Sequence, residues 1–491
     1  MRETWATLRE LLLPDGASLD ATRPRRHLET QLRTAITSGR LVPGTRLPST
    51  RDLALQLNVS RGTTLAVYEQ LVAEGYLESK RGSATRVTFG GVPRPVYPAP
   101  GETPPPFKEQ VVHCDLDPGF PSLSAFPRNA WLAEYRAGLS ALTDADLGYP
   151  PPAGLLSLRR EVASYLGRVR SMPTSADALV ITGGTFDALA VIADCLREAG
   201  HSTIAVEDPS NPHLLRMFTT HGLEPVPIAV DEEGLDVSRL DRSSCRAVLV
   251  TPAHQYPLGV QLSPRRRRAL IDWAIKGDCL VIEDDYDAEY RYDRAALGAL
   301  RTLAPTVVAY LGTLSKTLAP GLRIGWLAAP AWLCASVRNR KHLGDRGDNV
   351  ITQAAVREFL GTGGYDRHLR STRLQYRRLR ENLLESVSTH LPDCTPIGIE
   401  AGLHVVIRLP ENEQDSTLVE HLATAGIRVA ALTAYRHHHS GFPGLVLGWA
   451  QARPNQLATS IQTLAGIRRT LASEGRIPAA RLGLRDSPKT L

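Results

Sequence analysis

Five short apolar runs, separated by helical stretches, constrain the fold of this chain more than any other feature of its sequence. They are "ALVIT" (178–182), "TIAVE" (203–207), "AVLVT" (247–251), "LVIE" (280–283) and "VVAYLG" (307–312). Each run is apolar at consecutive positions rather than at alternate ones, which is typical of strands buried on both faces. Strands of that kind, connected by helices, predict a parallel α/β sheet.

The residues that follow each run are polar or rich in glycine and proline. They read "GGTFDAL", "EDPSNP", "TPAHQYPLG", "EDDYDAEYRY" and "GTLSK". Ligands of open α/β sheets bind at the carboxyl ends of the strands. The five strand exits together therefore predict one shared site more strongly than any single motif does.

The last exit places Lys316 directly after a buried strand. Desolvation there, with a nearby cation such as Arg323, would lower the pKa of this lysine and leave a nucleophilic amine. The side chains of Thr313, Ser315 and Arg323 are suited to holding a phosphate, and backbone N–H groups after "TGGT" would complete the cradle. Taken alone, Lys316 is better explained as a solvated surface lysine.

The fourth exit supplies an acidic and a phenolic side chain. Asp284 can keep a pyridine nitrogen protonated, which makes the ring an electron sink, and Tyr286 can hydrogen-bond to a ring hydroxyl. Asp284 and Asp285 alone are also compatible with a helix-capping pair. Their combination with Lys316 at this spacing favours a cofactor site.

These segments resemble the fold type I aminotransferases, which bind pyridoxal 5′-phosphate (PLP) as a Schiff base on a lysine. The resemblance covers "GFPSLSAFPRNAW", "LGYPPPAGLLSLRREVASYL", "TPAHQYPLG", "EDDYDAEYRY" and "GTLSKTLAPGLRIGW". It implies a mixed, mostly parallel sheet with a small C-terminal α+β subdomain, and PLP as the cofactor. It also implies that Lys316 is the Schiff-base lysine, with Asp284 on the pyridine nitrogen and Tyr286 on the ring hydroxyl. The phosphate would be held by Arg323, Ser315 and the backbone of Gly184 and Thr185, and Tyr149 would reach the phosphate of a neighbouring subunit.

Three positions depart from the aminotransferase pattern. Asn211 stands where an aromatic residue is expected to stack on the pyridine ring, and Phe186 stands where a glutamine commonly follows the phosphate loop. Phe186 would supply apolar contact instead. Val446 aligns with the arginine that binds a substrate carboxylate, and valine cannot make such a bidentate pair. We therefore still expect the Schiff base, but not ordinary transamination.

A segment rich in proline and glycine, "GGVPRPVYPAPGETPPPF", separates this large module from the start of the chain. Its lack of apolar periodicity is typical of an extended linker, with an irregular surface loop as the alternative. We expect an N-terminal tail (1–21), a first domain (22–90), the linker (91–112), a large domain (113–470) and a C-terminal tail (471–491).

The first domain is basic, whereas the rest of the chain is nearly neutral. Between Thr22 and Gly91 there are eleven Lys and Arg residues against five Asp and Glu, and the formal net charge of the whole chain is +6. A small basic module beside a large neutral one indicates nucleic-acid binding by the first.

The first domain also has the spacing of three helices followed by a hairpin. Apolar residues recur at helical spacing from 26 to 38, Ser49 is placed to cap a second helix, and Ser60 is placed to cap a third. The predicted buried face of the third helix consists of Val67, Tyr68, Leu71 and Val72. With two strands around a turn at Gly82, this pattern predicts a winged helix-turn-helix. An ordinary helical domain with solvated arginines is the alternative.

A winged helix-turn-helix inserts the N-terminal end of its third helix into the major groove. The contacts expected from this geometry are Arg51, Ser60, Arg61 and Thr63, with Arg81 and Gly82 at the wing tip. "LVPGTRLPSTRDLALQLNVSRGTTLAVYEQLVAEGYLESKRGS" is similar to the DNA-binding domain of the GntR family of bacterial transcription regulators, which implies the same contacts. Joined to the aminotransferase-like module, it resembles the MocR subfamily of these regulators.

Other features of the sequence argue against several further classes of site. The six cysteines are scattered without a Cys-x-x-Cys pair, which is typical of reduced thiols and not of a zinc module. There is no secretion signal and no apolar run near the ~20 residues of a membrane span, so we expect a cytoplasmic protein. No metal is expected at "HHH" (437–439), since consecutive side chains seldom converge on one ion. "PRRRR" (264–268) is expected to be a solvated helix start.

We therefore expect a homodimeric transcription regulator that binds double-stranded DNA at repeated half-sites. Its large domain would sense PLP, with an amine or amino acid as a candidate second effector. Two alternatives stay open: a working aminotransferase that carries a DNA-binding domain, and a module that has lost PLP and binds another small molecule.

Overall fold

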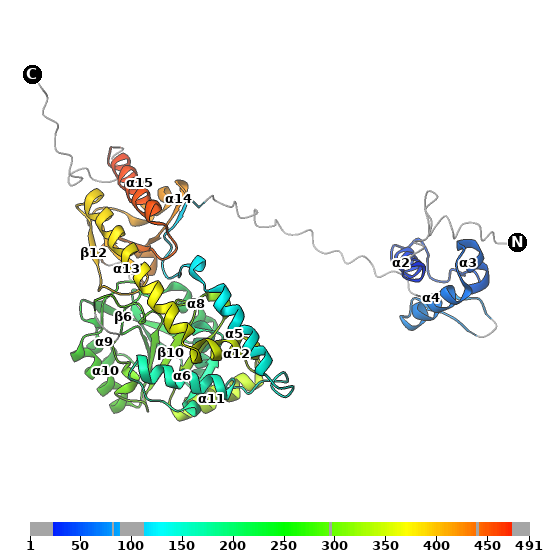
Figure 1. The fold of residues 1–491 in the computed structure, drawn as a ribbon, viewed down its shortest axis with the longest axis horizontal. Helices are drawn as coiled ribbons and strands as arrows, with labels where there is room; N and C mark the ends of the chain where they lie inside the picture. Colours follow the sequence, from blue (N-terminus) through cyan, green and yellow to red (C-terminus); the bar gives the residue numbers. More distant parts are fainter. Residues whose placement is uncertain (1–22, 81–82, 89–111, 294–296, 438–440, 474–491) are drawn as a thin grey trace, which may run out of the picture. The chain divides into compact units, whose positions relative to one another are not determined.

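The computed structural model describes residues 23–80, 83–88, 112–293, 297–437 and 441–473. It divides into two compact units, Met1–Glu109 and Gln110–Leu491, which are described separately below (Figure 1). The expected wing-tip residues Arg81 and Gly82 lie outside the described residues, as does the expected linker up to residue 111. No helix in the described ranges is both long and apolar enough to cross a membrane.

The first unit contains three helices and a short antiparallel strand pair, so the predicted winged helix-turn-helix is confirmed. Its elements are α2 (Pro24–Thr37), α3 (Thr50–Leu57), α4 (Arg61–Ala73), β1 (Leu77–Glu78) and β2 (Arg86–Val87). Leu28 and Leu32 of α2 pack with Val67 and Leu71 of α4 in one buried cluster. The prediction for Val72 is wrong: this residue lies in the last turn of α4 and is 36% exposed.

Serine caps fix the first residues of α3 and α4, as the sequence predicts. Ser49 Oγ accepts a hydrogen bond from the backbone N–H of Asp52 at 3.2 Å, and Ser60 Oγ accepts one from the N–H of Thr63 at 3.0 Å. Such caps satisfy backbone donors that the helix leaves free in its first turn. The cap at Ser60 therefore begins the recognition helix at Arg61.

The second unit is built around an eight-stranded sheet in the order β4-β11-β10-β9-β8-β5-β6-β7. Five consecutive strands of this order, β10, β9, β8, β5 and β6, are parallel to one another. In contrast, β11 is antiparallel to both β10 and β4, and β7 is antiparallel to β6. The sheet is thus mixed and mostly parallel, as predicted, and the five apolar runs form β4, β5, β8, β9 and β10. The strands are β4 (Leu179–Thr182), β5 (Thr203–Asp208), β6 (Glu224–Asp231), β7 (Gly234–Leu235), β8 (Ala247–Val250), β9 (Leu280–Asp285), β10 (Val308–Thr313) and β11 (Gly325–Ala328).

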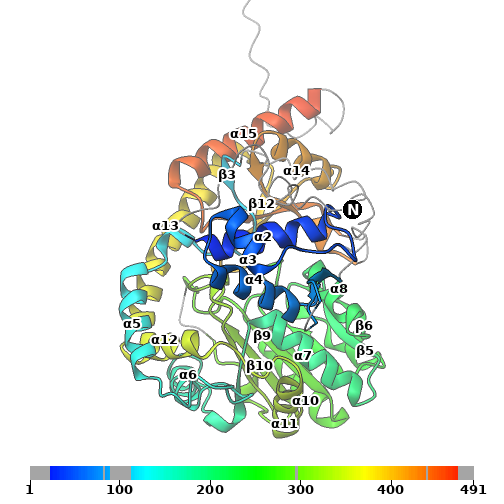
Figure 2. The same ribbon diagram turned by 90° about the vertical axis from the view of Figure 1, so that its right-hand side faces the viewer.

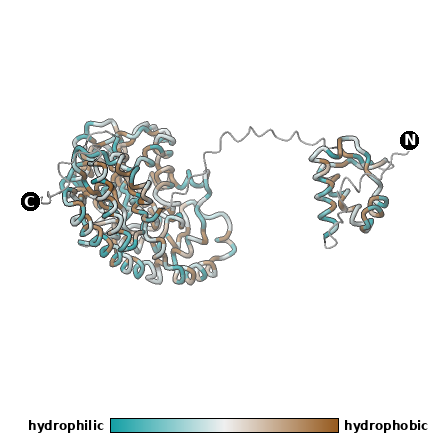
Figure 3. Tube along the Cα trace, turned by 90° about the horizontal axis from the view of Figure 1, so that it is seen from above, coloured by the Kyte–Doolittle hydropathy of each residue, from teal (hydrophilic) through white to brown (hydrophobic). Residues whose placement is uncertain are grey.

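Helices cover both faces of this sheet (Figure 2). One face packs against α7 (Thr185–Glu198), α8 (Pro212–Thr220) and α11 (Ala331–Leu343), and the other packs against α9 (Val237–Asp241) and α10 (Pro264–Gly277). Figure 3 shows hydrophobic and hydrophilic residues alternating around the turns of the helices, which is the pattern of elements with one buried side. The remaining helices are α5 (Arg128–Ala141), α6 (Leu156–Val169), α12 (Val350–Gly361) and α13 (Gly364–His390), with short 3-10 turns at Leu123–Ala125, Ala176–Ala178, Leu300–Thr302, Pro320–Leu322 and Leu432–Tyr435.

A smaller antiparallel sheet, in the order β12-β13-β16-β15, forms the expected C-terminal α+β subdomain. Its strands are β12 (Thr395–Ile397), β13 (His404–Arg408), β15 (Ala430–Ala431) and β16 (Gly444–Gly448), and its helices are α14 (Asp415–Thr424) and α15 (Pro454–Ser473). In addition, β3 (Cys114–Asp115) pairs in parallel with β14 (Ile427–Arg428). This pairing ties the first strand of the unit to its C-terminal part.

The arginine run at the start of α10 is less solvated than the sequence predicts. Ser263 caps the helix as expected, and Arg265 and Arg268 are exposed. Arg266, however, is buried and pairs with Asp231 at 2.6 Å. The run is therefore partly structural, because Asp231 at the end of β6 supplies a carboxylate beside it.

Candidate functional site

The register of the large sheet brings three strand exits to one place. Leu311 of β10 pairs with Asp284 of β9, so the segment after β10 that carries Lys316 lies beside Asp284. Gly325 of β11 pairs with both Thr313 and Thr182, which places the loop after β4 next to the end of β10. The predicted convergence of these exits is therefore a consequence of strand pairing.

The loop after β4 ends in a helix N-terminus that no side chain caps. Gly184 directly precedes α7 and has a φ of 104°. No side chain makes a capping hydrogen bond to the first turn of α7. A Cβ at Gly184 would lie 3.6 Å from Arg323 NH1 and 3.9 Å from both Ser315 Oγ and Thr313 Oγ1. A glycine is required by this positive φ, and the space above it is bounded by donors. Backbone N–H groups, two hydroxyls and a guanidinium at a helix start suit a phosphate group.

Two of these groups lack protein partners. The Arg323 guanidinium makes no hydrogen bond or ion pair with any residue that the structure describes. Thr185 Oγ1 is buried and also lacks a partner within the described chain. Arg323 is exposed and can be paired by solvent, whereas buried polar atoms are normally paired within the protein. A partner from outside the chain is therefore expected at Thr185 Oγ1.

Lys316 is half-buried, and this burial lowers the pKa of its ammonium group. The charges that act on it are the carboxylates of Asp284, Asp287 and Asp117, which oppose that decrease. The prediction that Arg323 lowers this pKa is therefore wrong, because no cation is among the groups that act on it. Desolvation is the effect that favours the neutral amine, the form that a nucleophile needs.

Asp284 is a buried acid whose charge acts on this lysine. Its Oδ1 atom is buried and has no hydrogen-bond partner among the described residues. Burial raises the pKa of Asp284 to about 7, with a contribution from the charge of Asp285, and Lys316 opposes the increase. A carboxylate with a free, buried oxygen is suited to accept a hydrogen bond from a protonated ring nitrogen.

Tyr286 lies in a buried polar cluster that includes a histidine absent from the predicted site. Its hydroxyl donates to the carbonyl oxygen of His254 at 3.0 Å and lies 3.2 Å from His254 Nδ1. His254 Nδ1 also lies 2.9 Å from Asp287 Oδ2. The exit "TPAHQYPLG" signalled this region, but nothing in the spacing singled out His254. Burial, followed by the charge of Asp287, raises the pKa of Tyr286 well above its usual range.

The remaining residues of the predicted cofactor site are Asn211, Phe186 and Tyr149. Asn211 Oδ1 accepts a hydrogen bond from the N–H of His213 at 3.0 Å and so caps α8. Phe186 is exposed in the first turn of α7, and Tyr149 is 81% exposed with the Arg346 guanidinium 5.0 Å from its ring centre. Tyr149 is too exposed to line a site within its own subunit.

Val446 occupies a fully apolar environment in β16. It is completely buried with Leu258, Val406 and Leu432. Burial among hydrocarbon side chains leaves no donor at this position for a carboxylate. Of the histidines at 437–439, the last two lie outside the described residues, so the structure does not address that run.

Four buried carboxyl groups give the folding of this unit a pH dependence. Burial raises the pKa of Glu207, Glu283, Asp284 and Glu289 to about 7 in each case. The same groups titrate near pH 4 in an unfolded chain, so the folded state holds more protons between about pH 4 and 7. The free energy of unfolding therefore falls as the pH rises through that range. We expect the PLP-free protein to unfold several degrees lower at pH 8 than at pH 6 in thermal denaturation.

The variant Asp284→Asn serves as the control for this pH dependence. Asparagine does not titrate, so the difference in unfolding temperature between pH 6 and pH 8 should shrink in the variant. An unfolding temperature that is equal or higher at pH 8 in the wild-type protein would contradict the assignment of these buried acids.

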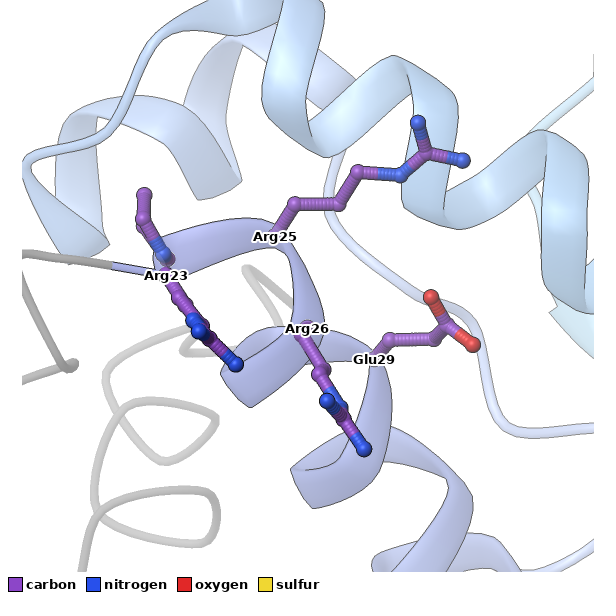
Figure 4. Close-up of a pocket in the computed structure, with 5 residues that line it drawn as sticks. Arg23, Arg25, Arg26 and Glu29 are labelled. Carbon is purple, nitrogen blue, oxygen red and sulfur yellow. The ribbon is translucent and has the colours of Figure 1, made fainter. Parts of the chain in front are cut away.

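The first unit presents its predicted DNA contacts at the starts of α3 and α4. Arg51 of α3 is exposed, as are Ser60 and Arg61 at the start of α4, and Thr63 is half-buried. Ser60 Oγ lies 2.8 Å from Thr63 Oγ1, so these two hydroxyls also stabilise the start of α4. Further positive charge lies at the first turn of α2, where a pocket is lined by Arg23, Pro24, Arg25, Arg26 and Glu29 (Figure 4). The unit is thus basic at three helix starts.

Comparison with known proteins agrees with both units. Residues 119–443 match the model of the aminotransferase class I and II family, and residues 24–87 match that of the gntR family of bacterial regulatory proteins. The HTH-type pyridoxine biosynthesis transcriptional regulator PdxR of Corynebacterium glutamicum is 34% identical over 427 residues, which cover 86% of this chain and 91% of the relative. The probable rhizopine catabolism regulatory protein MocR of Rhizobium meliloti is 29% identical over 480 residues, or 94% of this chain and 97% of the relative.

Among solved structures, an archaeal alanine:glyoxylate aminotransferase matches the large unit with a TM-score of 0.68 and 26% identity. The match covers 73% of this chain and 91% of that protein. The fold of the second unit is therefore that of a PLP-dependent enzyme family, joined to a regulator's DNA-binding domain. The chain belongs to the HTH-type transcription regulators of MocR architecture, in which a GntR-family domain precedes an aminotransferase class I and II domain.

Proposed function

We propose that this regulator binds PLP at Lys316 in its aminotransferase-like unit and that bound PLP changes the affinity of its helix-turn-helix for DNA. The observation that carries the proposal is Asp284, a buried carboxyl group with an unpaired oxygen beside a desolvated lysine. Leaving such an oxygen unpaired costs about 1–3 kcal/mol, which a hydrogen bond from a protonated pyridine nitrogen would offset. PLP, when bound, supplies an electron-withdrawing ring and an aldehyde.

Each part of PLP has a group of this chain that fits it. The phosphate fits the space above Gly184, between Arg323 and the hydroxyls of Ser315 and Thr313. Asp284 would hold the ring nitrogen, and Tyr286 would lie beside the ring hydroxyl. The amine of Lys316 would hold the aldehyde carbon. We propose these roles for the residues together, since each alone has an ordinary structural alternative.

We propose binding rather than turnover as the role of this site. An aminotransferase fixes the carboxylate of its substrate, most often with a bidentate arginine. Here the corresponding strand position is Val446, buried among apolar side chains. A site that holds PLP without that arginine is suited to sensing.

We further propose a homodimer that acts on DNA in the cytoplasm. The helix α5 and the segment after it expose Leu132, Leu139, Leu147 and Tyr149, with 56%, 43%, 54% and 81% of their surface accessible. Large apolar side chains gathered on one segment are typical of an interface. A two-fold dimer would present two recognition helices to repeated half-sites.

The absorbance spectrum of the purified protein tests the cofactor directly. The protein should show a visible band after PLP is added and unbound PLP is removed by gel filtration. A protein that stays colourless after this treatment would overturn the proposal and favour a unit that binds another molecule.

Replacing Arg61 by alanine is expected to weaken DNA binding. Arg61 is the first, exposed residue of the recognition helix, and loss of a base or phosphate contact costs about 1–3 kcal/mol, or roughly 5- to 150-fold in affinity. Fluorescence anisotropy on a duplex selected from a random library would measure the change. Arg268→Ala, at an exposed arginine of α10, is the matched control and should leave the affinity unchanged. An Arg61→Ala variant that binds like the wild type would contradict the assigned recognition helix.

A further inference from the structure

The segment 117–120 lies directly against Lys316. A Cβ at Gly119 would be 3.4 Å from Lys316 Nζ, and the Phe120 ring centre is 5.8 Å from the same atom. The segment is held in place by the N–H of Gly448, which donates to the carbonyl oxygen of Leu116 at 2.8 Å. The space around the lysine is therefore bounded on this side by the residues that follow β3.

Asp117 contributes a carboxylate to this side of the site. It is half-buried, and its side chain makes no hydrogen bond or ion pair with any residue in the described ranges. Its charge acts on Lys316 and on the hydroxyls of Tyr256 and Tyr435, which lie 3.2 Å apart. Burial, with the charge of Asp115, raises the pKa of Asp117, and the charges of Arg428 and Lys316 oppose the increase. A half-buried carboxylate without a partner is costly, and a cation beside it would relieve that cost.

His404 adds a second acceptor without a partner. Its Nε2 atom lies 3.0 Å from the carbonyl oxygen of Pro257, which can only accept, so Nε2 carries the hydrogen. Nδ1 is then a bare acceptor, and it is buried with no partner within the described residues. The His404 ring lies 5.0 Å from that of Tyr256, and the charge of Lys316 acts on it. Burial lowers the pKa of His404 well below its usual range, which keeps it neutral.

The other acids near Lys316 are already engaged or assigned. Asp287 Oδ2 lies 2.9 Å from His254 Nδ1, and Asp284 faces the proposed ring nitrogen. No cation acts on Lys316, and Val446 offers no guanidinium. The free groups near Lys316 are therefore acceptors, namely Asp117, and His404 Nδ1 in the cluster with His254 and Asp287. They complement N–H donors and repel a carboxylate.

We propose that the second effector of this regulator is an aliphatic diamine without a carboxylate, whose far ammonium pairs with Asp117. The inference rests on the proposed binding of PLP at Lys316. The near amine of the ligand would replace the Lys316 amine at the aldehyde carbon of PLP, so that one C–N bond forms as the other breaks and Lys316 leaves as the free amine. The far ammonium would lie by Asp117, with His404 Nδ1 as a further acceptor. Amino acids are disfavoured because their carboxylate would face Asp117, and Arg428, whose charge acts on Asp117, is already paired with Asp115 at 3.0 Å.

Three ligands of equal chain length test the proposal: 1,4-diaminobutane, butylamine and 4-aminobutanoate. Each is titrated by isothermal calorimetry into the PLP-loaded protein, after its visible band has been recorded. A charge-assisted hydrogen bond contributes enough for us to expect diaminobutane to bind roughly tenfold more tightly than butylamine. We expect 4-aminobutanoate to bind most weakly.

The isosteric variant Asp117→Asn should bring diaminobutane and butylamine to within about twofold of each other and leave butylamine unchanged. Asp272→Asn, at an exposed acid of α10, is the matched control and should keep the wild-type order. The proposal is overturned if 4-aminobutanoate binds as tightly as diaminobutane, or if Asp117→Asn keeps the diamine preference. A missing visible band overturns PLP binding and with it this inference, whereas a normal band without diamine preference overturns this inference alone.

Discussion

Replacing Lys316 by alanine is expected to abolish the visible band of bound PLP completely. The variant lacks the only amine that, among the described residues, lies half-buried and desolvated with its charge coupled to Asp284. Its helix-turn-helix lies in the other unit, so its affinity for DNA without PLP should equal that of the wild type. Absorbance after gel filtration measures the first expectation, and fluorescence anisotropy measures the second.

The small number of lysines makes this experiment specific. The chain has six: Lys80, Lys108, Lys276, Lys316, Lys341 and Lys489. Lys276 is exposed on α10, so Lys276→Ala is the matched control and should keep the band. Reduction of the loaded wild-type protein with borohydride, followed by peptide mapping, should mark Lys316. A variant Lys316→Ala that keeps the band, or a map that marks another lysine, would contradict the assignment.

Replacing Arg170 by methionine is expected to destabilise the large unit by about 3–5 kcal/mol, since breaking a buried ion pair leaves an uncompensated charge. Arg170 NH2 lies 2.7 Å from Asp285 Oδ2, and their side chains are 1% and 2% exposed. The Tyr310 hydroxyl donates to the same Asp285 oxygen at 2.6 Å. Chemical denaturation of the PLP-free protein would measure the loss.

The same helix region offers a matched control for that pair. Arg168 is 54% exposed and pairs with Asp366 at 3.1 Å, so Arg168→Met should cost only about 0–1 kcal/mol. The double variant Arg170→Met with Asp285→Asn should recover part of the loss, because it removes the unpaired charge. If Arg170→Met and Arg168→Met lowered the free energy of unfolding equally, the buried pair would contribute no more to stability than the exposed one, which would contradict the prediction.

The strands of the large sheet were predictable where burial on both faces requires apolar residues at consecutive positions. The five runs that form β4, β5, β8, β9 and β10 are apolar at consecutive positions because helices cover both faces. β6 was not predicted, because it contains Pro225 and Pro227, has half-buried residues and lies near the sheet edge. β11, "GWLA", was not predicted, although it is as short and as buried as β4 and β8. Its antiparallel insertion between β4 and β10 has no local signal.

The site was predictable to the extent that it follows from strand ends. The site combines residues from two strand exits: Gly184 follows β4, and Thr313, Ser315 and Arg323 lie at or after the end of β10. The structure brings the last three within 4 Å of one point above Gly184. Their role in binding PLP stays a prediction. Strand pairing explains the convergence, since parallel strands end at the same edge of a sheet.

The rest of the site depends on contacts between distant parts of the chain. His404 reaches the carbonyl oxygen of Pro257, 147 residues away in sequence. Asp117 lies near Lys316 because β3 is anchored to β14 and the backbone N–H of Gly448. No spacing rule relates such positions. The position of Asp117 near Lys316 could therefore be learned only from the fold. The same holds for the finding that Arg323 is not among the groups that act on the pKa of Lys316.

The central claim is that PLP bound at Lys316 controls the affinity of this protein for DNA. The most direct measurement is the dissociation constant of wild-type and Lys316→Ala protein for one duplex, with and without PLP, by fluorescence anisotropy. The duplex is selected from a random library, once with PLP-free and once with PLP-loaded protein. We predict that PLP changes the wild-type constant by at least about fivefold, as typical coupling energies imply, and leaves the variant unchanged. An equal response of the two proteins, or no response of the wild type, would contradict the claim.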